Sequence, residues 1–290
     1  MTEQIVGRRW LSYAVVTTLC WGVWGAFIEI PEKAGFPATL GYVAWSITMI
    51  PCSLIALGLA GWRLERNFRS VMLGSVIGFL GAGGQLILFQ ALRLGPAYLI
   101  FPIVSLYPVM TVLLSVSLLH EQATRRSWAG IALALVAIAL LSYNPGNAVA
   151  GGGMLWLIMT LLVFLFWGVQ AYVMKLATST MSAEGIFFYM MATGLALSPV
   201  ALVMTDFALP VNWGWNGPGL ALLIQVLNAI GALTLVYALR YGKAIIVVPM
   251  TALAPVITIV LSLMLYSVVP GTPMIVGILL ATIAMYLMAE

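Results

Sequence analysis

The chain has 290 residues, of which 63% are hydrophobic and 7% are charged, with a mean hydropathy of +1.11 and a formal net charge of +4. Soluble globular domains carry about 25% charged residues, so this composition excludes that class and indicates a membrane protein. With two cysteines and one histidine, we expect no disulfide framework, no metal site and no cofactor. The positive charges are interpreted as determinants of topology, and no nucleic-acid partner is expected.

Ten apolar stretches follow one another along the chain, and most are as long as a membrane-crossing helix. We therefore predict an all-α, polytopic membrane protein inserted in a lipid bilayer. The ten predicted spans lie at about residues 11–30, 40–61, 71–92, 96–119, 127–143, 153–175, 184–204, 218–238, 244–266 and 272–288.

The basic residues predict the orientation of these spans, because cytoplasmic loops are enriched in Lys and Arg. If both termini are cytoplasmic, only Lys33 and Arg93 fall outside. The other ten lie on the cytoplasmic side: Arg8, Arg9, Arg63, Arg66, Arg69, Arg125, Arg126, Lys175, Arg240 and Lys243. An odd number of spans would put the later basic loops on the wrong side.

An internal duplication organises the sequence. The segment Ala91–Leu118 recurs 147 residues later as Ala238–Leu265, with 13 identities in 28 ungapped positions. At the front of each half, Trp21-Gly22 recurs as Trp167-Gly168 at an offset of 146. The duplication predicts two units, residues 1–146 and 147–290, joined through the uncharged linker 144–153. Five spans in each unit would place the second upside-down relative to the first, as in many secondary transporters.

Proline pairs interrupt the duplicated segment at matched positions. Proline removes a backbone donor, and a membrane helix tolerates this where neighbouring helices or water satisfy the freed carbonyl groups. The pattern predicts two broken or kinked helices facing an interior, with these residues as hinges: Pro102, Pro108, Pro249 and Pro255.

Polar and aromatic side chains at membrane depth are the candidate substrate contacts. They can serve either as interhelical hydrogen bonds or as ligand contacts, and both interpretations stay open. Trp21 and Trp167 lie near mid-membrane at matched positions, where an indole N–H needs a partner. The other candidates are Gln85, Tyr107, Gln170, Asn228 and Thr251.

Glu29 is a carboxylate near the outer end of the first span, with Lys175 at the corresponding position of the second half. It can pair with Lys33 at the surface, or it can face the cavity entrance and bind a cation or a proton. For Glu121 the adjacent basic residues favour a surface charge cluster. We expect no catalytic residue, because one interfacial histidine and no nucleotide-binding or metalloprotease motif leave nothing for an enzyme.

Together these features resemble the drug/metabolite transporter superfamily in its ten-helix EamA-type form. The resemblance rests on the duplicated unit, on Trp-Gly with a charged residue eight positions after the Trp, and on the R-x-G-x-A…P segment. The family usually has Lys at that eighth position in both halves and an acidic residue at the position of Glu121, whereas the second half here has Val268. The resemblance implies a central cavity and transport of small organic metabolites such as amino acids across the bacterial inner membrane.

The leading hypothesis is a secondary transporter that works by alternating access and exports amino acids or similar metabolites. The alternatives are uptake of a sugar-like or cationic solute, a channel, or a non-transporting scaffold. A channel usually needs a filter ring that this sequence lacks. Proton coupling and facilitated diffusion both stay open at this point.

Overall fold

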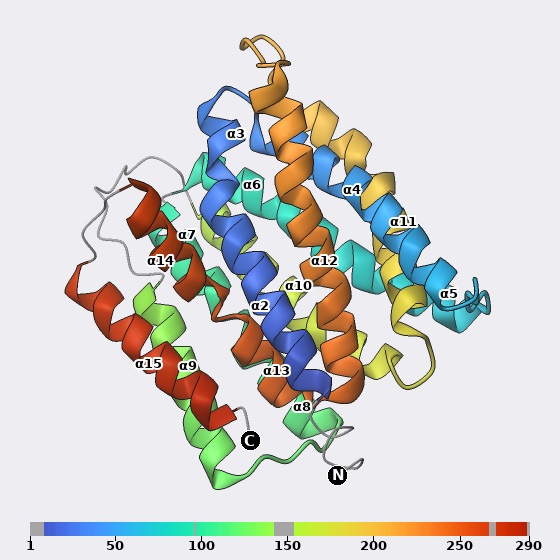
Figure 1. The fold of residues 1–290 in the computed structure, drawn as a ribbon, viewed down its shortest axis with the longest axis vertical. Helices are drawn as coiled ribbons and strands as arrows, with labels where there is room; N and C mark the ends of the chain where they lie inside the picture. Colours follow the sequence, from blue (N-terminus) through green and yellow to red (C-terminus); the bar gives the residue numbers. More distant parts are fainter. Residues whose placement is uncertain (1–8, 96, 142–153, 267–270, 289–290) are drawn as a thin grey trace.

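The computed structural model describes residues 9–95, 97–141, 154–266 and 271–288, and all regular secondary structure in these ranges is helical (Figure 1). The helices of the first half are α2 (Arg9–Phe27), α3 (Glu29–Lys33), α4 (Ala38–Leu59), α5 (Phe68–Gly78), η1 (Phe79–Gly83), α6 (Gly84–Leu94), α7 (Ala97–Ser105), α8 (Tyr107–Leu118) and α9 (Arg125–Leu141). Those of the second half are α10 (Leu155–Ala177), α11 (Ala183–Met204), η2 (Trp215–Gly219), α12 (Leu220–Tyr241), α13 (Ala244–Thr251), α14 (Ala254–Tyr266) and α15 (Thr272–Met288).

The ten predicted spans are accounted for by these helices. Seven described helices are long and apolar enough to cross a membrane, and Ile103–Leu118 and Thr272–Met288 are shorter apolar helices. With α9 they make ten, which confirms the all-helical membrane fold. The start of α2 and the end of α15 lie at the same end of the bundle (Figure 1), as an even number of spans requires. The linker Asn144–Gly153 and Val268 lie outside the described residues.

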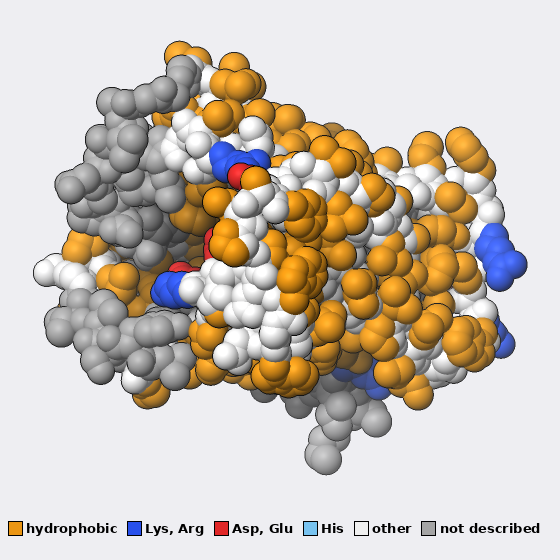
Figure 2. Space-filling model, turned by 90° about the horizontal axis from the view of Figure 1, so that it is seen from above, with side chains coloured by type: hydrophobic (Ala, Val, Ile, Leu, Met, Phe, Trp, Pro, Cys, Tyr) orange, Lys and Arg blue, Asp and Glu red, His pale blue; other side chains and the backbone are white. Residues whose placement is uncertain are grey.

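The surface matches a protein that meets lipid. Many large hydrophobic side chains are exposed, among them Leu59, Phe68 and Val203, each more than 80% exposed. Seen from the end where α3 lies, orange hydrophobic side chains cover much of the described surface and the cations gather in a few spots (Figure 2). In water such a surface would be unfavourable, whereas a bilayer solvates it.

Both duplicated segments contain a break at the same position. α7 ends at Ser105 and α8 begins at Tyr107, whereas α13 ends at Thr251 and α14 begins at Ala254. The turn residues Leu106 and Leu253 are related by the 147-residue offset. Each donates its N–H to the carbonyl three residues before it, at 3.3 and 3.2 Å, and accepts from the N–H three residues after it.

The prolines explain why the chain restarts there. Pro108 and Pro255 each stand second in the new helix, where a missing N–H leaves no intrahelical bond unmade. Pro249 lies inside α13, and Pro102 falls within α7. The helices are therefore discontinuous where the sequence predicts breaks, while the role of the prolines as hinges stays a prediction.

The long first helix of each half packs against helices of the other half. α2 packs along α12 and α14, and α10 packs along α6 and α8 (Figure 1). The fifth helices of the two halves, α9 and α15, lie side by side. The two halves of the sequence therefore do not fold as two separate bodies, because the first helix of each half packs among the helices of the other half.

Candidate functional site

Two tryptophans make the same cross-half contact in both directions. Trp21 on α2 donates its Nε1–H to the carbonyl of Asn228 on α12 at 3.4 Å, and Trp167 on α10 donates to the carbonyl of Gly81 in η1 at 3.2 Å. The two acceptors are related by the 147-residue offset. The need for an indole partner is therefore met by backbone carbonyls of the opposite half.

Glycines permit these contacts. A Cβ atom on Gly231 would lie 2.5 Å from the Trp21 ring, and one on Gly84 would lie 2.6 Å from Trp167 Nε1. Both glycines lie three residues after the acceptor carbonyl, and they too are related by the offset. Glycine is required at these two positions because any side chain would displace the indole.

The glycine after each tryptophan accepts a second hydrogen bond from the opposite half, again in both directions. Thr258 on α14 donates to the Gly22 carbonyl at 2.9 Å, and Thr111 on α8 donates to the Gly168 carbonyl at 2.9 Å. The two threonines are identical residues of the duplicated segment. Each first helix therefore lies between the third and the broken fourth helix of the opposite half, as the repeat symmetry demands.

Around Trp167 the structure brings together two further predicted site residues, Tyr107 and Gln170. The Tyr107 ring meets the Trp167 ring edge-on, with centroids 6.1 Å apart. The Gln170 amide packs against Gly81, where a Cβ atom would lie 2.2 Å from its Nε2. Gln85 follows Gly84 on α6 and is partly buried. These side chains come from α10, α8 and α6.

Next to them the third span contains an irregular turn. η1, Phe79–Gly83, is a π-helical segment between α5 and α6 and has four glycines in or next to it: Gly78, Gly81, Gly83 and Gly84. Single π turns inside α-helices are frequent at functional sites. The turn lies beside Trp167, because its Gly81 carbonyl accepts from the indole N–H.

Trp21 and Asn228, on α2 and α12, contact each other through the bond described above. The remaining two predicted contacts are placed differently. The Thr251 hydroxyl is 1% exposed and donates to the carbonyls of its own helix. Glu29 is exposed and forms an ion pair with Lys33 at 2.6 Å. The described contacts leave the joining of all eight residues in one cavity as a prediction.

A hydrogen-bonded chain that the sequence analysis missed lies beside Asn228. Gln225 is 4% exposed, and its Oε1 accepts from Trp24 Nε1 at 3.0 Å and from Asn228 Nδ2 at 3.3 Å. Its Nε2 donates to the Gly41 carbonyl on α4 at 3.2 Å. The sequence does contain a signal for this chain. Trp21 and Trp24, and likewise Gln225 and Asn228, are one helical turn apart, so each pair lies on one face of its helix.

Two charges hold the turn between α12 and α13. Lys175 Nζ donates to the carbonyls of Leu239 and Gly242 at 2.8 and 2.6 Å, at the end of α12. The Glu121 carboxylate accepts from the N–H groups of Ala244 and Ile245 at 3.1 and 3.0 Å, at the start of α13. Each charge complements the helix dipole that it faces.

This arrangement differs from the surface cluster predicted for Glu121. The adjacent Arg125 and Arg126 suggested solvent-exposed charge, but two orphan N–H groups at a helix start bind a carboxylate through directed hydrogen bonds. Lys175 therefore has a specific partner of its own, the end of α12, which its counterpart Glu29 cannot bind because a carboxylate does not donate.

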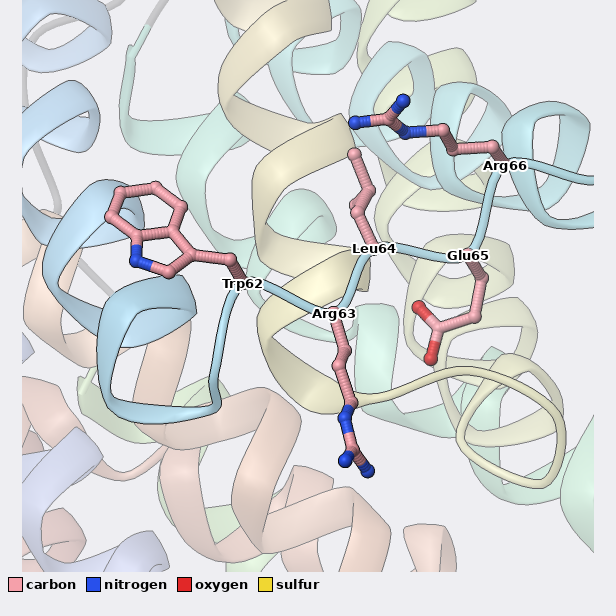
Figure 3. A pocket seen from close by; sticks show the side chains of 5 residues that line it. All are labelled: Trp62, Arg63, Leu64, Glu65 and Arg66. Atoms are coloured by element: carbon pink, nitrogen blue, oxygen red, sulfur yellow. The ribbon is translucent and has the colours of Figure 1, made fainter.

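A hollow on the described surface lies away from the contacts between the repeats. It has a volume of about 370 Å³ and is lined by residues 62–66 of the loop after α4. Figure 3 shows Arg63 and Glu65 pointing to one side of this loop and Leu64 to the other. The Glu65 carboxylate binds Ser182 N and Oγ at 2.9 and 3.1 Å, at the start of α11. This hollow belongs to a helix cap and not to a substrate pathway.

Two related halves, apolar spans, exchanged first helices and broken fourth helices define a two-repeat helical membrane protein. The chain belongs to the EamA-like transporter family, whose model matches it twice, over residues 8–143 and 154–289. The predicted membership in the drug/metabolite transporter superfamily is thereby confirmed.

The chain is also similar to two known proteins and to a solved structure. Protein LicB of Haemophilus influenzae is 24% identical over 215 residues, which are 70% of this chain and 71% of LicB. An uncharacterised protein of Methanocaldococcus jannaschii is 28% identical over 133 residues, 46% of this chain but 95% of that protein. The archaeal protein thus has about the length of one repeat. A solved crystal structure shares the fold with a TM-score of 0.76, 18% identity, and coverage of 95% of this chain and 97% of the other.

Proposed function

We propose that this protein is a secondary transporter that moves small organic metabolites by alternating access, with export of amino acids or similar solutes as the leading case. It acts as a carrier and not as an enzyme. The observation that supports this most is the reciprocal crossing of Trp21 and Trp167 beside broken helices, because inverted repeats with broken helices at mid-membrane are typical of secondary transporters. A scaffold has no need of matched breaks in both halves.

The experiment that tests a carrier is counterflow in proteoliposomes. The purified chain is screened by thermal shift against amino acids, sugars, nucleosides and quaternary amines, and the stabilising solutes are then tested for exchange. We expect saturable counterflow of at least one solute. Linear, non-saturable flux would indicate a channel, and no flux for any stabilising solute would overturn the carrier proposal.

Substitution of Trp167 tests the candidate site. Trp167→Ala removes both the indole and its packing against Gly84, so we expect counterflow to fall more than tenfold. Trp167→Phe keeps most of the packing and removes the N–H that binds Gly81, which separates substrate contact from folding. Normal counterflow by Trp167→Ala would show that this residue only packs.

The orientation is tested with reporter tags. We expect tags on either terminus to report the cytoplasm and a tag within Asn144–Gly153 to report the outside, because ten of the twelve basic residues then lie inside. An externally accessible C-terminus would contradict this orientation in the bacterial inner membrane.

Coupling to protons is tested at Glu29. The residue is 58% exposed at its side chain and paired with Lys33, which supports a surface role and facilitated or weakly coupled transport. We therefore expect Glu29→Gln to leave both counterflow and pH-driven transport unchanged. Loss of pH-driven transport with counterflow preserved would instead identify Glu29 as the coupling group.

A further inference from the structure

The amide of Gln225 has only one orientation that its surroundings allow. An indole N–H can only donate, so the atom facing Trp24 Nε1 at 3.0 Å must be the Gln225 carbonyl oxygen. A backbone carbonyl can only accept, so the atom facing the Gly41 oxygen at 3.2 Å must be the Gln225 amino group. The two partners lie on α2 and α4, and each one independently excludes the flipped amide.

This orientation determines that of Asn228. Gln225 Oε1 is an acceptor, so Asn228 must turn its amino group toward it, at 3.3 Å. The Asn228 side-chain oxygen, Oδ1, then points away from Gln225, and it accepts from no residue that the structure describes. The Trp24 N–H thus orients the Gln225 amide, which orients the Asn228 amide and leaves Asn228 Oδ1 as an acceptor without a described donor.

The free acceptor faces the protein interior. Asn228 is partly exposed, although it lies in the middle of the buried side of α12. Its neighbours one turn away on that side are 5% or less exposed: Ile224, Gln225 and Ala232. On the opposite side Leu223 is 63% exposed, toward lipid. Because the residues around Asn228 on its side of α12 are buried, we infer that the exposed part of its side chain faces a space between helices and not lipid.

The matched position in the other half has no such polarity. The repeat offsets place Gln170 where α2 has Trp24, and Gly81 where α12 has Asn228. The Gln170 amide packs on Gly81 and bonds to no described residue, so it can present either end to a ligand. One wall of the predicted cavity therefore presents an acceptor of fixed orientation, on Asn228. The other presents the Gln170 amide, which can turn either end toward a ligand.

We propose that the substrate presents a hydrogen-bond donor, an ammonium or other N–H group, to the side-chain oxygen of Asn228, Oδ1, and that Gln225 is the residue that positions the Asn228 side chain. This inference rests on the proposed carrier function and specifies the substrate class of its site. A carboxylate or phosphate at this wall would meet an acceptor, and a fully methylated nitrogen would leave that acceptor unpaired at a cost. The indoles of Trp21 and Trp24 on α2 would favour a cationic donor further.

Matched pairs of solutes test this directly. Glycine is compared with its trimethylammonium analogue, and adenosine with its dimethylamino analogue, as competitors of counterflow alongside the solute panel named above. We expect every solute that exchanges to carry an N–H group and its methylated analogue to compete on the order of tenfold more weakly. Equal competition by the methylated analogues would overturn the inference while the carrier function stood. Absence of saturable exchange for the whole panel would overturn both.

Variants separate a ligand contact from a structural bond. Asn228→Leu should weaken apparent affinity for the N–H solute on the order of tenfold with maximal exchange retained, and should leave the methylated analogue unaffected. Asn228→Asp keeps an acceptor facing the cavity, although it loses the N–H that bonds to Gln225, and should retain preference for the N–H solute. Thr282→Val, which changes an exposed hydroxyl bonded within its own helix, is the control for expression and folding.

Gln225 is tested by a loss and a rescue. Gln225→Leu removes both constraints on the network, so Asn228 can turn and discrimination between the paired solutes should disappear. Gln225→Glu in its neutral, protonated form still accepts from Trp24 and Asn228 and donates its O–H to the Gly41 carbonyl, so it should restore discrimination. If the Asn228 and Gln225 variants reduce affinity for both members of a pair equally, or only lower thermal stability, the network is interhelical packing and the inference is wrong.

Discussion

Gly168→Ala is expected to destabilise the folded protein by about 1–3 kcal/mol and to lower the yield of correctly folded protein in the membrane. The added Cβ atom would lie 2.5 Å from Met110 Cβ and 3.0 Å from the Tyr107 backbone oxygen. Neither atom is the end of a flexible side chain, so α8 and α10 must separate. That separation also strains the Thr111–Gly168 hydrogen bond of 2.9 Å.

The repeat supplies both a replicate and a control for this experiment. Gly22→Ala should have the same effect, because its Cβ atom would lie 2.5 Å from Ile257 Cβ and 2.9 Å from the Ala254 oxygen. Gly58→Ala is the matched control, since its Cβ atom would only touch Trp62 at 3.5 Å, and alanine favours a helix by up to about 1 kcal/mol over glycine. Equal melting temperatures for Gly168→Ala and Gly58→Ala would contradict the close crossing.

Lys175→Met is expected to cost about 3 kcal/mol or more of folding free energy. It removes two charge-assisted hydrogen bonds to the end of α12, each typically worth about 1.5–3 kcal/mol, and methionine retains much of the apolar length of the side chain. The carbonyls of Leu239 and Gly242 would lose their partner beside the turn that leads into α13. Thermal unfolding of the purified variant measures the loss.

Lys243→Met is the comparison, because Lys243 lies in the same turn but is exposed and donates to a single backbone carbonyl, that of Gln122. Water can replace an exposed bond, so its effect should stay within about 1 kcal/mol. A double-mutant cycle with Glu121→Gln then measures whether the two charges stabilise the turn together, and a coupling above about 0.5 kcal/mol is expected for groups that share one turn. If Lys175→Met melts like Lys243→Met, the two carbonyl bonds contribute nothing to stability.

Much of the fold could be predicted from local pattern alone. Apolar length gave the spans, and Pro108 and Pro255 marked the breaks at Leu106 and Leu253 within two residues. The duplication alone matches Trp21 with Trp167. These predictions hold because apolar length and proline determine structure locally, at the residues that carry them.

The pairing between halves could not be predicted in this way. An offset of 146 or 147 shows which residues correspond, but it does not say that Trp21 contacts Gly231 of the opposite half. The same limit explains why Gln225 and Trp24 were missed, since their bond joins residues 201 positions apart. Glu121 was placed in a surface cluster because its true partners, two backbone N–H groups, have no side-chain signature.

The exchange of first helices has a consequence for biosynthesis. The Trp21–Asn228 bond joins residues 207 positions apart, and the Gly22–Thr258 bond joins residues 236 apart. At about 5–20 residues per second, a ribosome needs roughly 10–40 s to add the 207 residues that bring α12 to α2. During that interval α2 sits in the bilayer without its packing partners, and the crossing can close only after most of the second half has been synthesised. Nascent chains that stall before residue 220 therefore should expose α2 to membrane proteases, whereas chains released beyond residue 260 should protect it.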